Sequence, residues 1–444
     1  MQKTDTAWWQ QVLADTANLR EPIVLPNVFE NEVDDLSELT VDIFRKLTQA
    51  RGTESGFRVW VSDEHGAIAP EPTKAYDESL CQNPPLPGET ISAWGKRIFG
   101  DRKFGIIMND GQLYSAEMNQ KIARKIQPLL DLIGMPLTGV STTYFVGNYG
   151  YTPLGIHQDR IGEDVFHFHL GPGPKVMYTW DEELYRSISG VMNNRTNIEE
   201  LLPAANKYPF EAGDIFFMPW DKFHVGHSDE ISLGLTMWIN NPTPAFFIRK
   251  LARSILGEIT PIKDRAIMMN TVLSPDSGIP GDPKIFEELA PYIQVDEAMA
   301  DLSLQEFMRF SIESYRLGLL SNGGFVLLQT PEPLDADALL GHVVQLVQPF
   351  KIFHLVLKQK IFLFVRGYRL SLAYHPALPG LLARLNTGEP VPVEDLIEPL
   401  LGEWAPDVAR YVVALLLSHR GIELADAAAA AGLAPADRMA AVLA

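Results

Sequence analysis

The chain has 444 residues, of which 46% are hydrophobic, and carries a formal net charge of −19 at pH 7. This length predicts two or three domains, and the acidic balance argues against nucleic acid or an anionic membrane as a partner while favouring a cationic protein or peptide. The single cysteine, Cys81, excludes an intramolecular disulfide framework and a cysteine-based zinc site. The sequence shows neither an apolar leader nor a run of about 18 apolar residues, so we expect a cytoplasmic protein that does not contact membranes.

Residues 1–135 are expected to form a mixed helical and extended part that completes the first domain. Apolar residues recur at helical spacing over residues 34–51 and 115–132, whereas residues 57–61 have the aromatic and β-branched character of a strand. A Gly-Met-Pro sequence then marks the end of this part.

Residues 136–244 have the character of a β domain. Short aromatic and β-branched runs alternate there with Gly, Pro and Asn, and the predicted strands are residues 140–146, 165–170, 175–180, 214–219 and 232–239. Runs of this kind predict a double-sheet jelly roll, that is, a double-stranded β-helix.

The second half of the chain is predicted to be helical at first and mixed later. Residues 245–321 form a helical segment with helices at 245–256 and 303–320, separated by a Pro- and Gly-rich linker at 274–283. In residues 322–424, three strand-like runs precede three helical patterns, at 352–357, 361–365, 370–374, 376–385, 393–401 and 406–419. These elements suggest a winged-helix-like domain, followed by an alanine-rich tail at 425–444. The predicted fold class of the whole chain is α+β.

Two histidines and an aspartate in the β-rich part form a candidate metal site. His157 and Asp159 lie two positions apart, so both side chains point to one side of an extended segment. His224 follows the strand-like residues 214–219 and reaches the same point if the two segments pair. Two imidazoles and one carboxylate on one face of a metal leave its other face open, as in non-haem Fe(II) oxygenases. His227, three residues further along, is the alternative third ligand.

An HxD pair is weak evidence when taken alone, because short motifs often arise by chance. The surrounding sequence supports metal binding here, since half of the ten histidines lie between His157 and His227, within the predicted jelly roll. Imidazole and carboxylate ligands suit Fe(II), and no cysteine cluster is present to favour a softer metal.

Three stretches of the β-rich part resemble the JmjC-type, cupin-fold oxygenases that depend on Fe(II) and 2-oxoglutarate: Thr152–Asp159, Gly173–Tyr178 and Gly213–His224. The resemblance covers residues 140–240. Within that family, the sequence is similar in particular to the branch that contains ribosomal oxygenases and asparaginyl hydroxylases. It implies Fe(II), 2-oxoglutarate as co-substrate and O2, with a helical dimerisation region and a winged-helix-like domain after the barrel.

The resemblance also implies a binding site for 2-oxoglutarate. Lys175 corresponds to the basic residue that pairs with the distal carboxylate of the co-substrate, a pairing that would compensate a buried cation. A surface lysine is the alternative interpretation. Tyr144 and Thr152 would supply hydroxyls to the same carboxylate, and Asn240 or Trp238 would line the pocket from the last strand.

Two features of the sequence near Lys175 leave undecided which side chains surround it. The insertion Gly171–Pro174 lengthens the hairpin that precedes Lys175 and makes its register uncertain. His167 and His169 share one face of their strand, and they line either a substrate cavity or the core of the barrel.

The resulting prediction is a homodimeric Fe(II)- and 2-oxoglutarate-dependent oxygenase that hydroxylates a side chain of a protein or peptide. Hydroxylation of a small molecule or free amino acid is an alternative, as is another metal in the same triad without 2-oxoglutarate. A third alternative is a non-catalytic barrel whose winged-helix-like module binds DNA. Residues 245–444 carry an excess of acidic residues, however, so nucleic acid is not an expected partner.

Overall fold

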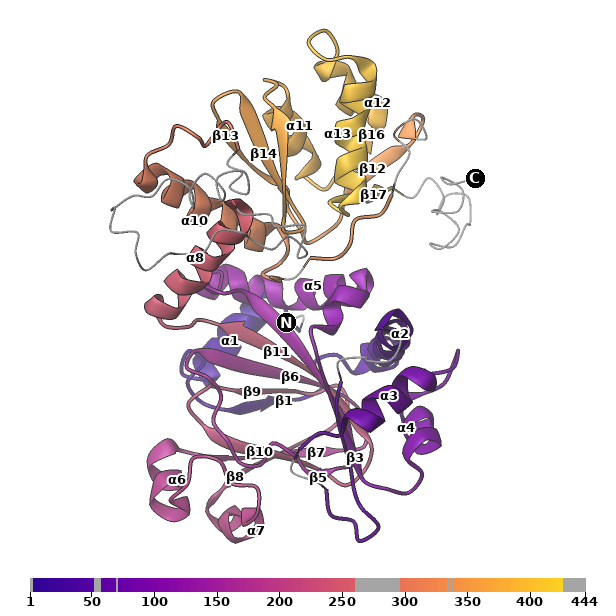
Figure 1. Ribbon diagram of the computed structural model, residues 1–444, viewed down its shortest axis with the longest axis vertical. Coiled ribbons are helices and arrows are strands. Elements are labelled where there is room, and N and C mark those ends of the chain that lie inside the picture. Colours follow the sequence, from indigo (N-terminus) through magenta and orange to yellow (C-terminus); the bar gives the residue numbers. More distant parts are fainter. Residues whose placement is uncertain are drawn as a thin grey trace, which may run out of the picture.

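Figure 1 shows the computed structural model of the chain, with two sheet-containing parts joined through helices. The structure describes residues 3–51, 57–68, 71–259, 296–326, 328–333, 336 and 339–425. It combines helices with several antiparallel sheets, which agrees with the predicted α+β class. The predicted linker at 274–283 lies outside the described residues, and so does the alanine-rich tail apart from Ala425. No helix in the described ranges is long and apolar enough to cross a membrane.

Two antiparallel sheets frame the first part. The larger sheet has seven strands in the order β1 (Ile23–Leu25), β9 (Ile215–Met218), β6 (Glu163–Pro172), β11 (Ser232–Asn240), β4 (Val140–Gly147), β3 (Phe104–Asn109) and β2 (Arg58–Val61). The smaller sheet has four strands in the order β5 (Gly150–Tyr151), β10 (Phe223–Ser228), β7 (Lys175–Trp180) and β8 (Asn206–Phe210). Apart from the neighbours β7 and β8, consecutive strands from β4 to β11 lie in different sheets.

Side chains on the larger sheet alternate between an apolar outer face and a more polar inner face. On β6, Phe166 and Phe168 pack into the main hydrophobic core, whereas His167 between them points into the space between the sheets. Trp9 is fully buried against the outer face, with its ring edge-on to Phe166 at a centroid distance of 5.5 Å. Its indole N–H donates to the carbonyl of Lys125 at 2.9 Å.

Helices cover both outer faces (Figure 1). The larger sheet is covered by α1 (Thr6–Asp15), α2 (Val33–Arg51) and α5 (Ala116–Ile133), which contribute to the main core. The smaller sheet is covered by α6 (Glu182–Ser189) and α7 (Ile198–Leu201), where Tyr185 stacks on Phe223 at 4.0 Å. The predicted helices at 34–51 and 115–132 are confirmed to within one residue. The inner faces are therefore free to form a polar site.

The rest of the chain forms a second core beyond the helices α8 (Pro244–Ile259) and α10 (Leu304–Ser321). One three-stranded sheet has the order β16 (Val391–Pro392), β12 (Val343–Leu346) and β17 (Ile422–Leu424), and the other β13 (Phe353–Leu357), β14 (Lys360–Val365) and β15 (Tyr368–Ala373). Helices α11 (Leu378–Leu385), α12 (Val393–Ile397) and α13 (Pro406–Ser418) pack with them. The predicted helix at 393–401 is shorter than expected, because Pro399 lies in a 3-10 turn that follows α12.

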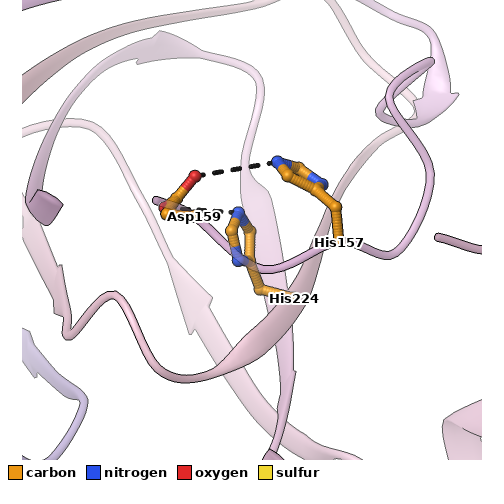
Figure 2. Close-up of side chains that lie close together, drawn as sticks. All are labelled: His157, Asp159 and His224. Carbon is orange, nitrogen blue, oxygen red and sulfur yellow. Dashed lines mark ion pairs between the residues drawn. The ribbon is translucent and has the colours of Figure 1, made fainter. Parts of the chain in front are cut away.

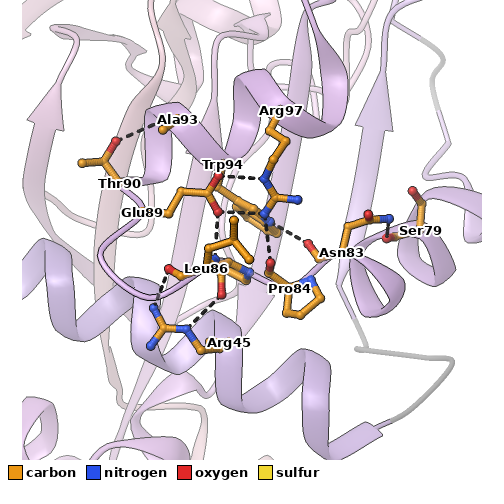
Figure 3. Close-up of polar contacts among 11 residues, drawn as sticks. Arg45, Ser79, Asn83, Pro84, Leu86, Glu89, Thr90, Ala93, Trp94 and Arg97 are labelled. Atoms are coloured by element: carbon orange, nitrogen blue, oxygen red, sulfur yellow. Dashed lines mark hydrogen bonds and ion pairs between the residues drawn. The ribbon is translucent and has the colours of Figure 1, made fainter.

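Polar contacts fix the loop between α3 (Lys74–Gln82) and α4 (Ile91–Phe99), as Figure 3 shows. Arg97 donates to both carboxylate oxygens of Glu89, each at 2.7 Å, and also to the carbonyl of Pro84 at 2.9 Å. The carboxylate of Glu89 also accepts from the backbone N–H of Leu86. These bonds, that to Arg97 foremost, lower the pKa of Glu89 below its ordinary value of 4.5.

We predict that Glu89→Gln lowers the free energy of unfolding at pH 7 by about 1 kcal/mol or less, because the ion pair is partly exposed. Since the folded-state pKa of Glu89 is lowered, this stabilisation is present above pH 4.5 and is lost as the pH falls through the lower folded-state value. Denaturant unfolding of both proteins between pH 7 and pH 3 measures the difference. Glu78→Gln, at an exposed position of α3, is the control and should change little. A difference that persists undiminished at pH 3 would contradict the prediction.

Candidate active site

The three predicted metal ligands lie together (Figure 2). His157 and Asp159 come from the extended segment after β5, and His224 is the second residue of β10. The backbones of the two histidines exchange hydrogen bonds: the N–H of His157 donates to the carbonyl of His224 at 3.1 Å, and the reverse bond is 2.8 Å. The two segments therefore pair, which is the condition under which His224 reaches the same point as His157 and Asp159. The sequence analysis placed His224 just beyond the end of a strand, and this is corrected. A turn at 220–221 separates β9 from β10, and His224 lies within β10.

The ligand atoms converge on one point. One such atom from each residue lies within 4.8 Å of the others. Carboxylate oxygens of Asp159 lie 3.8 Å from Nε2 of His157 and 3.9 Å from Nε2 of His224. The Nδ1 atoms face backbone carbonyls, of Gly155 at 2.9 Å and of Lys222 at 3.3 Å. A neutral imidazole that donates from Nδ1 keeps its lone pair on Nε2, so both Nε2 atoms are available as metal ligands.

Burial sets the protonation of this group. It lowers the pKa of both His157 and His224 to about 4, so both imidazoles are neutral at pH 7. It raises the pKa of Asp159 to about 7, and one carboxylate oxygen of Asp159 has no hydrogen-bond partner in the described ranges. A divalent cation would stabilise the ionised carboxylate and bind the neutral imidazoles.

His227 does not belong to this group. It lies on β10, but its side chain is on the face opposite to that of His224. Its ring packs on Tyr151 with centroids 4.7 Å apart, and its Nε2 is 3.7 Å from Asp229. His224, and not His227, therefore lies in the group of three residues that could hold a metal ion.

A cavity of about 530 Å³ lies between the two sheets and reaches all three ligands. Inward side chains of β4, β6, β9 and β11 form one wall, and those of β7 and β10 form the other. At the mouth the side chain of Arg160 is 85% exposed. At the inner end Lys175 is 3% and His167 2% exposed. The cavity is thus open at one end and closed at the other.

Lys175, the first residue of β7, is buried at the closed end. Its ammonium lies 5.3 Å from the ring centroid of Phe145 and 5.7 Å from that of Tyr149, and it makes no ion pair or hydrogen bond within the described residues. Gly226 makes room for it, since a Cβ there would lie 3.1 Å from Cε of Lys175. A buried cation without a counter-charge is unfavourable by several kcal/mol. An anion bound at this end would remove that penalty.

His167 is a second group at the closed end whose hydrogen bonding is incomplete. Its Nδ1 lies 2.9 Å from Oγ1 of Thr236, but its Nε2 has no partner in the part of the chain that the structure describes. Burial, with the charge of Lys175 as a smaller cause, holds the pKa of His167 well below its ordinary value. The ring lies against Gly234, where a Cβ would be 2.1 Å from it. His169, by contrast, does not line the cavity and bonds to a loop carbonyl.

Three other residues predicted for the site line the cavity. Thr152 is buried beside Gly226 and donates its hydroxyl to the carbonyl of Gly226 at 2.9 Å. Asn240 and Trp238 lie on the inner face of β11, and the indole N–H of Trp238 donates to Oγ1 of Thr143 at 3.0 Å.

Tyr144 does not reach the cavity, and its predicted role is corrected. Side chains alternate along β4, so Thr143 and Phe145 face the cavity while Tyr144 points to the outer core. There its ring is edge-on to Phe44 at a centroid distance of 6.5 Å, and burial raises its pKa. Tyr144 therefore supplies no hydroxyl to a ligand in the cavity.

Three polar residues at the mouth have no counterpart in the sequence predictions. Arg58 of β2, Asn109 of β3 and Lys250 of α8 all line the cavity. The signal that could have found Arg58 is a charged residue within an otherwise apolar strand. Asn109 and Lys250 carry no such signal, because only the order of the strands and the return of α8 bring them to the mouth.

No family model and no curated protein matches the chain, whereas solved structures do. A ribosomal oxygenase, YcfD from Escherichia coli, is similar over 94% of this chain and 98% of that chain, with 15% sequence identity and a TM-score of 0.49. Its complex with cobalt and 2-oxoglutarate gives 14% identity and a TM-score of 0.48 over the same shares. The α-ketoglutarate-dependent carbocyclase SnoK from nogalamycin biosynthesis has 13% identity and a TM-score of 0.33, covering 52% of this chain and 83% of that chain.

We predict that the purified protein binds one Mn(II) or Co(II), and that His157→Ala or His224→Ala reduces this binding to background, because each removes one of three protein ligands. Anaerobic calorimetry measures the affinity, and thermal melting confirms that the variants are folded. His227→Ala is the matched control, since His227 lies in the same strand outside the triad. Equal loss of binding in all three variants would contradict the assignment of the triad.

Proposed function

We propose that this protein is an Fe(II)- and 2-oxoglutarate-dependent oxygenase that hydroxylates a side chain of a protein or peptide. One observation carries the proposal: a His-Asp-His group opens onto a cavity whose closed end holds the cation of Lys175, which has no ion pair among the described residues. A metal at one end and an uncompensated ammonium at the other suit a dianion that chelates the metal and places its second carboxylate on Lys175.

The residues fit Fe(II). His157, Asp159 and His224 would hold it through two neutral imidazoles and one carboxylate, the donor set that non-haem Fe(II) oxygenases use. All three residues line the cavity, so a metal held by them would be accessible to other ligands from the cavity. When bound, Fe(II) with 2-oxoglutarate and O2 supplies the oxidation, in which 2-oxoglutarate yields succinate and carbon dioxide and one oxygen atom enters the substrate.

The closed end fits the distal carboxylate of 2-oxoglutarate. Lys175 supplies the charge, and His167 supplies a donor when its Nδ1 accepts from the hydroxyl of Thr236 and its Nε2 carries the proton. Thr152 is less suited than the sequence suggests, because its hydroxyl proton is directed to a backbone carbonyl. A volume of about 530 Å³ leaves room for a substrate side chain beside the co-substrate.

The protein's own groups bind and orient the reactants and exclude water. The rings of Phe145 and Tyr149 enclose the ammonium of Lys175, so its interaction with a carboxylate takes place in a low dielectric. The backbone bonds between His157 and His224 hold two ligands at a fixed spacing. Catalysis then depends on placing a C–H bond of the substrate next to the open side of the metal.

The finer architecture is part of this proposal. We infer that β4 to β11 form a jelly roll, which is supported by the two four-strand sets and their alternation between sheets. Residues 1–135 would complete this catalytic domain with residues 136–244. The helical segment 245–321 would mediate a homodimer, and residues 322–424 would form a winged-helix-like domain in a cytoplasmic enzyme.

A protein substrate is supported by the surface around the mouth. Phe246 lines the cavity and is 53% exposed, which provides an apolar contact for a peptide. A free amino acid or other small molecule is the alternative substrate, and a non-catalytic DNA-binding protein is the alternative function. The filled ligand positions and the acidic second half of the chain favour the enzyme.

The test is formation of succinate from 2-oxoglutarate by the protein with Fe(II) in air, detected by mass spectrometry.

We predict that Lys175→Met weakens binding of 2-oxoglutarate to the Mn(II)-loaded protein roughly ten- to a hundredfold, as expected for loss of a charged hydrogen bond. His167→Phe should also weaken it, by about tenfold or more, because a hydrogen bond to a charged carboxylate contributes about 1.5–3 kcal/mol. Anaerobic calorimetry measures both affinities.

Lys207→Met is the matched control for Lys175→Met, because Lys207 is an exposed lysine on the neighbouring strand β8. It should leave the affinity for 2-oxoglutarate unchanged. Binding that is equally strong in Lys175→Met would show that the co-substrate does not use this cation. Absence of succinate from the Fe(II)-loaded wild-type protein, tested with cell extract as the source of substrate, would contradict the proposed activity.

A further inference from the structure

A row of hydrogen-bonded side chains crosses four adjacent strands at the mouth of the cavity. The strands lie in the order β11, β4, β3 and β2. The indole N–H of Trp238 donates to Oγ1 of Thr143 at 3.0 Å, and Thr143 donates to Oδ1 of Asn109 at 3.1 Å. Arg58 approaches the same Oδ1 at 3.5 Å. All four residues line the cavity.

The chemistry of the donors determines which group donates and which accepts in each hydrogen bond of this row. Indole has only a donor, so the oxygen of Thr143 accepts from Trp238 and its proton goes to Asn109. Guanidinium also has only donors, so Arg58 must face the oxygen of the Asn109 amide. The NH2 group of Asn109 is therefore turned away from the row, and it has no acceptor in the described ranges. The oxygen of Asn109 therefore accepts two hydrogen bonds within the row, and its NH2 group is the donor that the row can offer to a ligand.

Positive charge accompanies these donors. Arg58 and Lys250 are half-buried at the mouth, and burial lowers the pKa of each. Neither makes an ion pair within the described residues, although the chain as a whole has a net charge of −19. Asp110 and Glu163 also line the cavity but pair with neither cation, and Glu163 lies 4.0 Å from Arg160 instead. Among the residues that the structure describes, these two partly desolvated cations thus have no counter-charge.

We infer that the mouth binds a carboxylate of the substrate, held by Arg58 and Lys250 with the amide of Asn109. Guanidinium presents a fork of N–H groups that matches the two oxygens of a carboxylate. The substrate would then carry an acidic group close to the position that is oxidised, either an acidic side chain of a protein segment or the carboxylate of a free amino acid. This inference rests on the proposed function for the identity of the ligand as the substrate.

Selection from a random peptide library on the immobilised protein, in the presence of Mn(II) and saturating 2-oxoglutarate, tests the inference. We expect the wild-type protein to enrich Asp and Glu, and Arg58→Gln combined with Lys250→Gln to abolish that enrichment. The affinity of a selected acidic peptide, measured by calorimetry, should fall about tenfold or more in either single variant, as for loss of a charged hydrogen bond.

Arg160→Gln is the matched control. It removes the same charge from the same cavity, but the side chain of Arg160 is 85% exposed and is placed near Glu163, so acidic enrichment should persist. Wild-type selection without acidic residues, or equal enrichment in the double variant, would overturn the inference. Melting temperatures of the variants, together with their unchanged affinity for Mn(II), establish that the cavity is intact.

A second measurement distinguishes the two sources of the carboxylate. Tighter binding of the selected peptide than of free glutamate identifies a protein segment, and the reverse identifies a small molecule; both depend on Arg58 and Lys250 if the inference holds. Peptide binding requires no turnover, whereas succinate formation reports only the oxygenase activity. The inference can therefore fail while the proposed function stands, and the proposed function can fail while the carboxylate site stands.

Discussion

The structure depends on the separation of apolar and polar side chains onto opposite faces of two sheets. On β6 the outward Phe166 and Phe168 join the main core, and the inward His167 faces the cavity. On the smaller sheet, Trp180 and Phe223 bury the outer face under α6 and α7. Because helices supply the apolar partners outside, stability does not require an apolar interior between the sheets. The interior can then hold imidazoles, a carboxylate and an ammonium without unfolding the protein.

Within that interior, a buried charge without a counter-charge is more unfavourable than a missing hydrogen bond. An unmade hydrogen bond at Nε2 of His167 is unfavourable by about 1–3 kcal/mol, whereas an uncompensated ammonium such as that of Lys175 is unfavourable by several kcal/mol. The imidazoles of His157 and His224 are neutral, so they add no positive charge to the cavity. In the proposed function, Lys175 would therefore be the main determinant of which ligand enters, and it would favour an anion at the closed end. The neutral His167 would add a directional hydrogen bond to the same anion.

The candidate site could be predicted from the sequence where the geometry is local. The two-residue spacing of His157 and Asp159 fixes their common side on any extended segment. The prediction for Tyr144 failed, because a resemblance gives a strand but not the face on which each residue lies, and Thr143 has the inward position. The mouth was not predictable, since Arg58 and Asn109 meet only through the order of strands that are far apart in the chain. Long-range pairing of this kind leaves no periodic signal.

The net charge of the chain and the charges of Arg58 and Lys250, which line the cavity, have opposite signs. A net charge of −19 predicts a cationic partner, because the summed field attracts positive charge at long range. That field is screened over roughly 8 Å at physiological ionic strength, whereas contacts in a half-buried mouth are shorter and less screened. Arg58, Lys250 and the amide of Asn109 act only at contact distance. An acidic ligand would thus be repelled weakly on approach and held strongly once bound, so its specificity would reside in the rate of dissociation rather than in the rate of encounter.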